Sequence, residues 1–156
     1  MNQPSSLLPG KGLRYLFVLL FTVLAFTGVG QMPIFKRYYI TDIPGLGWSG
    51  DFYLTHTIHY LGAFLLLVLV AYIVAIYLLD LRRSYSLSLP GLIRALFLAG
   101  LVLTGILRVL KNLPQVTFSP LSTMLIDISH LGFMFLFLLA AAAFKLAGQG
   151  WLRPSY

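Results

Sequence analysis

The chain has 156 residues, of which 59% are hydrophobic and only 10% are charged. An average soluble domain carries about 25% charged residues, so this composition excludes an ordinary soluble globule and indicates lipid as the solvent. The net charge of +7 comes from eleven lysines and arginines against four acidic residues. These cations lie mostly at the ends of apolar runs, which is typical of headgroup contacts and not of nucleic-acid binding. The absence of cysteine excludes disulfides, thiolate metal sites and covalently attached c-type haem.

Four stretches reach the roughly 20 apolar residues that a membrane-spanning helix needs. In chain order we expect spans at about 15–31, 52–79, 91–110 and 121–146. They form one membrane domain, 15–147, between an N-terminal segment 1–14 and a C-terminal tail 148–156. The first apolar run is long for a signal peptide, so we expect it to be retained as a helix. The connections are short and hold prolines, glycines and charges, and no internal repeat is evident. This pattern predicts an all-α, antiparallel four-helix bundle in the membrane.

The distribution of lysine and arginine predicts the orientation of these spans. If both termini lie on one side, that side collects seven cations and the other side four. The positive-inside rule therefore predicts both termini in the cytoplasm, in a bacterial-type inner membrane. Two cations of the third span, Arg94 and Arg108, fall near its ends, where we expect their long side chains to extend to the headgroups.

Histidines inside the spans are the main candidates for a functional site, because ionisable residues are costly in lipid. His56, His59 and His130 all fall in spans, in the half nearer the outer face. At 1.5 Å per residue, His59 and His130 lie about 12 and 15 Å along their helices. Two imidazoles at a similar depth can bind the two axial positions of one haem b, which needs no cysteine.

Small residues near the histidines suit such a cofactor. Gly62 lies one turn from His59 and Gly132 two residues from His130. Both could allow close helix packing or leave room for a porphyrin edge. Spacing favours a structural role for His56, but His56 could instead bind a haem propionate or replace His59 as the ligand, because residues at i and i+3 share a helix face.

A carboxylate and two cations lie at the outer end of the last two spans. Asp127 is three residues before His130 and could hydrogen-bond a histidine or carry protons, but we expect it to pair with Arg108 or Lys111 instead. The two cations are also candidates to neutralise haem propionates. The alternative for both is a contact with lipid headgroups.

The loop at 32–51 is the expected docking surface for a partner protein. It holds several aromatic residues and two further cations that are also propionate candidates: Tyr38, Tyr39, Trp48, Lys36 and Arg37. The alternative is that the loop lies on the lipid headgroups, where tyrosine and tryptophan are enriched.

The chain resembles the four-helix b-type cytochrome subunits of membrane-bound formate dehydrogenases and nickel–iron hydrogenases over about residues 13–147. Three stretches carry the likeness: LRYLFVLLFTVLAFTGVG in the first span, RYYITDIPGLGWSGDFYLTHTIHYLG at the approach to the second, and TMLIDISHLGFMFLFLLAAAAFKLAG in the last. The resemblance implies a subunit that passes electrons from an iron–sulfur subunit to quinone through haems b. His59 and His130 stand at the positions of the outer haem's ligands.

The ligands of the inner haem are absent from this chain. Arg14 and Tyr15 occupy the region of the first ligand, and Phe144 stands where the second would be. The resemblance therefore implies a variant that holds one outer haem, and it does not extend to the family's inner quinone site.

We therefore expect an electron-transfer subunit with one low-spin, bis-histidine haem b rather than a self-contained catalyst. It would relay electrons between an extracytoplasmic iron–sulfur or cytochrome subunit and membrane quinone. The alternative is a haem-free membrane anchor or assembly subunit whose histidines only bond neighbouring helices. A small proton-coupled transporter that uses Asp127 and the histidines is disfavoured, because such transporters show internal repeats and broken helices.

Overall fold

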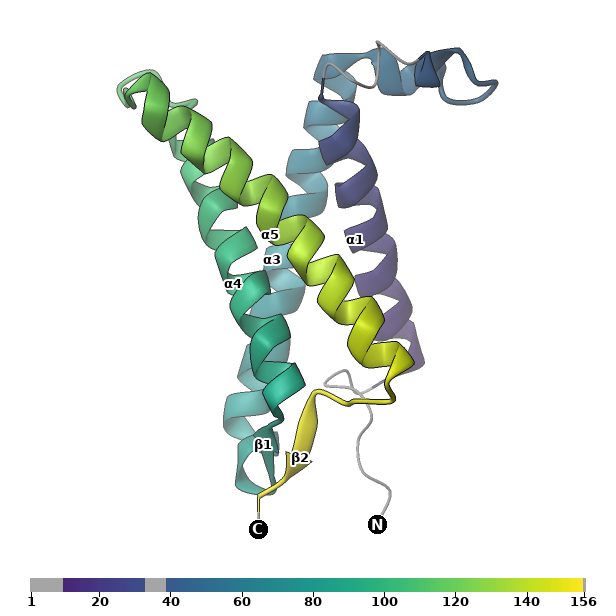
Figure 1. Ribbon diagram of the computed structural model, residues 1–156, viewed down its shortest axis with the longest axis vertical. Coiled ribbons are helices and arrows are strands. Elements are labelled where there is room, and N and C mark those ends of the chain that lie inside the picture. Colours follow the sequence, from purple (N-terminus) through teal and green to yellow (C-terminus); the bar gives the residue numbers. More distant parts are fainter. Residues whose placement is uncertain (1–9, 33–38, 156) are drawn as a thin grey trace. The chain divides into compact units, whose positions relative to one another are not determined.

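The computed structural model describes residues 10–32 and 39–155, and four long helices dominate it (Figure 1). These are α1 (Lys11–Gly30), α3 (Phe52–Leu79), α4 (Leu89–Leu110) and α5 (Pro120–Leu146). All four are long and apolar enough to cross a membrane. The predicted all-α, transmembrane fold class is therefore confirmed, and the chain is an integral membrane protein. The helices belong to two compact units, one built on α1 and α3 and the other on α4 and α5.

The first unit is an antiparallel hairpin of α1 and α3 (Figure 1). Leucines at helical spacing on both helices form its core: Leu20, Leu24, Leu66 and Leu69. Two short 3-10 helices, η1 (Ile40–Asp42) and η2 (Gly47–Gly50), precede α3. The carboxylate of Asp51 accepts hydrogen bonds from the backbone N–H groups of Tyr53 and Leu54 at 2.9 and 3.1 Å and so caps the start of α3.

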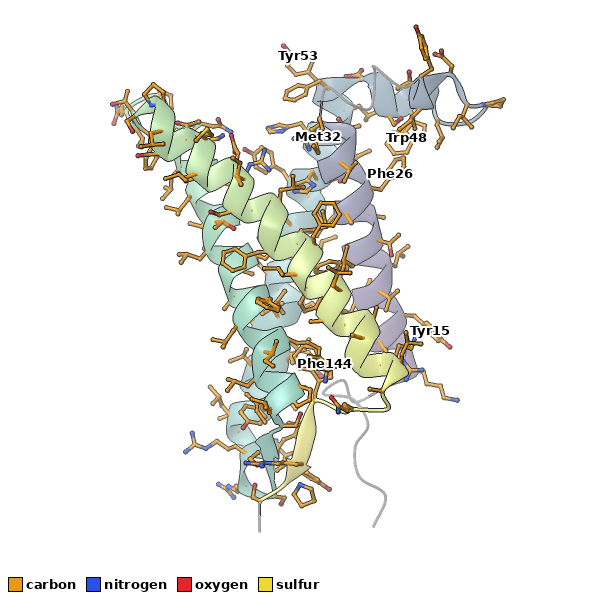
Figure 2. All side chains as sticks on the ribbon, in the orientation of Figure 1. Tyr15, Phe26, Met32, Trp48, Tyr53 and Phe144 are labelled. Atoms are coloured by element: carbon orange, nitrogen blue, oxygen red, sulfur yellow. The ribbon has the colours of Figure 1, made fainter. Side chains whose placement is uncertain are left out.

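The loop of the first unit is tied to α1 by aromatic packing. The ring centroids of Trp48 and Phe26 are 5.7 Å apart, and Figure 2 shows these two side chains next to one another at the end of α1. Tyr53 is 81% exposed. Three residues of the predicted docking surface, Lys36, Arg37 and Tyr38, lie outside the described residues.

The second unit is a hairpin of α4 and α5, and both helices begin with a serine followed by proline or leucine–proline. The side chain of Ser88 accepts from the N–H of Gly91, and that of Ser119 from the N–H of Ser122. Pro90 and Pro120 lie in the first turn, where a missing N–H costs no hydrogen bond. With these caps, α4 begins two residues before its predicted start at 91, and α5 begins one residue before its predicted start at 121.

A small sheet, which the sequence did not predict, joins the two ends of the second unit. Strand β1 (Tyr85–Leu87) follows the 3-10 helix η3 (Leu81–Arg83) and pairs antiparallel with β2 (Leu152–Pro154) (Figure 1). The expected basic turn at 80–90 and C-terminal tail at 148–156 therefore pair with each other. A strand of three residues is too short to show the alternation of apolar and polar side chains by which strands are predicted. The two strands are also more than sixty residues apart in the sequence.

The side chain of Arg94 does not extend to the headgroups as expected, because the C-terminal segment folds over it. Arg94 is only 4% exposed. Its guanidinium donates to the carbonyls of Gln149 and Gly150 at 3.2 and 2.8 Å and lies 4.4 Å from the ring centroid of Trp151. Backbone carbonyls and an aromatic face thus replace the headgroups as partners of the charge.

Candidate functional site

The first candidate histidine, His59, is held by a hydrogen bond to the neighbouring helix. Its Nδ1 lies 3.0 Å from Oγ1 of Thr27, a fully buried residue in the last third of α1. The same Oγ1 lies 2.8 Å from the carbonyl of Val23 on its own helix. Since a carbonyl can only accept, the hydroxyl proton is donated to Val23, and Oγ1 accepts the proton of Nδ1.

The second candidate, His130, is held in the same way in the other unit. Its Nδ1 lies 3.1 Å from Oγ1 of Thr104, which is 7% exposed and lies in the last third of α4. Oγ1 of Thr104 lies 2.8 Å from the carbonyl of Gly100, four residues earlier. The hydroxyl again donates to its own helix and accepts from the imidazole.

A glycine follows each of the two threonines and lies against the imidazole. A Cβ atom at Gly28 would lie 3.2 Å from Cε1 of His59, and one at Gly105 would lie 3.3 Å from Cε1 of His130. These separations are tighter than nine in ten real Cβ contacts, so a residue larger than glycine would require the ring to shift by a few tenths of an ångström. Each imidazole is therefore held by a hydrogen bond at Nδ1, and the glycine leaves room for its Cε1 side.

A small arrangement of side chains is thus repeated in the two units, although it is not an internal repeat of whole spans. A Thr–Gly pair at 27–28 and again at 104–105 faces a histidine in the first half of the next helix. Thirty-two residues separate threonine from histidine in the first unit and 26 in the second. The different loop lengths hide the repeat, and the only sequence signals are the short strings FTG and LTG.

The hydrogen bond determines which ring nitrogen can act as a ligand. With its proton on Nδ1, a neutral imidazole carries its lone pair on Nε2. Metal-binding histidines usually donate the other ring N–H to an acceptor, which fixes both the tautomer and the ring orientation. His59 and His130 both have this arrangement.

His56, the third histidine, is bound differently. Its Nδ1 lies 3.3 Å from Oε1 of Gln31, and its ring packs between Phe52 and Tyr60 at centroid distances of 5.4 and 4.3 Å. These contacts fit the structural role that its spacing favoured. They give His56 no threonine partner of the kind that His59 has.

Asp127 forms ion pairs with both cations at the end of α4, as predicted. Its carboxylate lies 3.1 Å from Nε of Arg108 and 2.6 Å from Nζ of Lys111. One carboxylate between two cations leaves a net charge of +1, one turn from His130. Its engagement by both cations accords with a structural role rather than proton transfer.

The two glycines predicted to border the cofactor have different surroundings. A Cβ at Gly62 would lie 3.2 Å from Cδ2 of Leu24, so Gly62 allows α1 and α3 to pack closely. At Gly132 no described atom lies within 4 Å of such a Cβ. Gly132 therefore serves no packing between α4 and α5.

The described residues hold no group of three or more histidines, cysteines or carboxylates that could bind a metal ion by themselves. A porphyrin supplies four nitrogens to its iron and leaves two axial positions, which imidazoles can occupy.

No family model, curated relative or solved structure matches this chain. The likeness to the b-type cytochrome subunits therefore stays a prediction from motifs. The chemistry of the site follows from its own residues.

Proposed function

We propose that the protein is a membrane-bound electron-transfer subunit in which His59 and His130 bind the two axial positions of one haem b. The repeated imidazole site carries this proposal. One histidine in each unit is held by the same Thr–Gly pair, and each has its lone pair on Nε2. A bis-histidine haem takes two such neutral imidazoles as its axial ligands.

The surrounding side chains fit a haem that is held without covalent attachment. Apolar or aromatic residues follow both histidines on their helices, among them Tyr60 and Leu61 after His59 and Leu131 and Met134 after His130, and the chain has no cysteine. Such walls exclude water from the iron and keep a porphyrin in place by burial of its apolar faces.

The topology of a four-span chain supports a common depth for the two histidines. Each hairpin crosses the membrane twice, so both begin on the same side. His59 and His130 then both fall in the half of the membrane that contains the ends of α1 and α4. With both termini in the cytoplasm of a bacterial-type inner membrane, this is the outer half.

The haem supplies one-electron chemistry, and the protein positions it between an extracytoplasmic iron–sulfur or cytochrome subunit and membrane quinone. The net positive charge of Arg108, Lys111 and Asp127 suits a haem propionate and favours the reduced state. The exposed aromatic residues Tyr39 and Tyr53, with Trp48, suit a contact with the partner or with lipid headgroups.

The test is optical and uses the purified full-length chain. We expect a b-type reduced spectrum and one haem per polypeptide by the pyridine haemochrome assay. His59→Ala and His130→Ala should each abolish low-spin haem, because each removes one axial ligand. His56→Ala should retain it, which separates the two candidates on α3.

The other outcomes decide between the alternatives. A colourless but stably folded protein, with unchanged helical content by circular dichroism, would favour the haem-free anchor. Two haems per chain would show that ligands other than His59 and His130 are used.

A further inference from the structure

We propose that Thr27 and Thr104 are positioning residues. Their hydroxyls keep the imidazole proton of His59 and His130 on Nδ1, so that Nε2 is the atom that binds the ligand. This inference rests on the proposed function for the identity of the ligand. The hydrogen bonds themselves are properties of the polypeptide and can be examined without haem.

Each threonine hydroxyl has a single proton, and that proton is donated within its own helix. Oγ1 of Thr27 and of Thr104 lies 2.8 Å from the carbonyl four residues earlier on its own helix. That carbonyl can only accept, so the threonine proton is used within its helix. Nδ1 of the facing histidine, at 3.0 or 3.1 Å, is therefore the donor.

The orientation of the imidazole ring depends on the glycine as well as on the threonine. A hydrogen bond at Nδ1 alone leaves the imidazole free to tilt about that contact. A Cβ atom at Gly28 or Gly105 would lie 3.2 or 3.3 Å from Cε1 of the facing histidine, so glycine at these positions leaves room for the ring in its present orientation. The threonine thus selects the protonated nitrogen, and the glycine accommodates the ring orientation that sets the direction of Nε2.

The group that accepts the Nδ1 proton is a neutral hydroxyl and not a carboxylate. Many metal-bound histidines donate to a carboxylate, which draws the proton away and makes the ring a stronger electron donor. A buried carboxylate is costly in lipid, whereas a threonine satisfies its own hydroxyl within the helix. Threonine therefore supplies the orientation without placing a negative charge beside the iron.

The same geometry in both units separates this role from ordinary helix packing. The core residues of the two hairpins differ: a leucine lies against Gly62 in the first, and a phenylalanine lies against Gly100 in the second. The Thr–Gly–His arrangement is nevertheless reproduced to within about 0.1 Å in the bond from Nδ1 to Oγ1, at 3.0 and 3.1 Å.

The experiment compares Thr27→Val and Thr104→Val with Thr27→Ser and Thr104→Ser in the purified full-length chain. Valine removes the hydroxyl oxygen that accepts the Nδ1 proton, without a change in side-chain shape. We expect each valine variant to lower haem affinity by about 10- to 100-fold and to shift the midpoint potential upward. Serine keeps the hydroxyl and should restore both values.

Thr22→Val is the matched control. Thr22 also lies on α1, and its Oγ1 also donates to the carbonyl four residues earlier, at 2.8 Å, but this residue is exposed. The substitution removes the same intrahelical bond without touching a histidine. Haem affinity and potential should therefore stay at the wild-type values.

A second measurement keeps the proposal separate from the haem itself. The chain has only three histidines, so their ring ¹⁵N resonances can be assigned with His56, His59 and His130 variants. In haem-free protein we expect His59 and His130 to carry the proton on Nδ1, and to lose this preference in the corresponding valine variants. A wild-type Nε2–H tautomer would overturn the inference.

The outcomes distinguish the inference from the proposed function. If the wild type binds no haem but shows the expected tautomers, the function fails and the positioning role stands. If haem binds and the valine variants keep the wild-type affinity and potential, the threonines only bond neighbouring helices and the inference fails.

Discussion

Buried polar side chains in this protein are paired, mostly with backbone carbonyls. Every buried side-chain nitrogen and oxygen among the described residues has a hydrogen-bond partner. Thr27 and Thr104 use the carbonyls of their own helices, and Arg94 uses those of the C-terminal segment. In lipid an unpaired polar group has no water to turn to, so each of these contacts is required.

The ion pairs of Asp127 allow a test of whether a charged group near the membrane also needs its partners. Asp127→Asn leaves Arg108 and Lys111 close together without the carboxylate between them. Because the group is partly exposed, we expect a loss of about 1 kcal/mol in the free energy of unfolding, at the upper end for such pairs. Denaturation of the purified protein in mixed micelles measures this loss.

Asp42→Asn is the control for that measurement, because Asp42 is exposed in the loop of the first unit. It should leave the unfolding free energy within about 0.5 kcal/mol of the wild type. Equal stability of the two variants would mean that the ion pairs at Asp127 contribute nothing.

At the scale of the helices, the two hairpins use small residues at opposite positions. Three residues after the histidine, α3 has Gly62 facing Leu24 of α1, whereas α5 has Phe133 facing Gly100 of α4. A large side chain therefore meets a glycine in both pairs. In both hairpins a glycine lets the two helices pack closely. This glycine lies on α3 in the first hairpin and on α4 in the second.

Gly100→Ala should destabilise the α4–α5 hairpin. The new Cβ would lie 2.7 Å from the ring of Phe133, so the ring or the helix must move. Overpacking of this kind costs about 1–3 kcal/mol, which denaturation in mixed micelles would measure. Adding Phe133→Leu should recover most of the loss by making space.

Gly12→Ala is the matched control for this substitution. No described atom lies within 4 Å of a Cβ at Gly12, and alanine favours helix more than glycine does. Its stability should equal or exceed that of the wild type. A Gly100→Ala variant as stable as Gly12→Ala would contradict the packing described for α4 and α5.

At the scale of the whole molecule, the absence of cysteine allows a direct test of the membrane orientation. Gln115 is exposed in the connection between α4 and α5, and Ser84 is exposed between α3 and α4. With both termini in the cytoplasm, a membrane-impermeant maleimide should label Gln115→Cys in intact cells. Ser84→Cys should be labelled only after the membrane is permeabilised.

The reverse labelling pattern would place both histidines in the cytoplasmic half. It would contradict the proposed orientation without touching the ligation of the haem. Equal labelling of both variants in intact cells would show that the connections do not alternate between the two sides of the membrane.

The sequence by itself determined the four helices, because lipid permits little else for long apolar runs, whereas three of their starts lie one to four residues before the predicted ones. It also located both histidines and the pairing of Asp127 with its cations, since residues one turn from a helix end can be placed by counting. The tertiary structure decided the rest: the Thr–Gly pairs that hold the two histidines and the C-terminal segment that covers Arg94. Their partners lie 26 to 56 residues away. A threonine in an apolar helix gives no sign of its role until the neighbouring helix brings an imidazole to its hydroxyl.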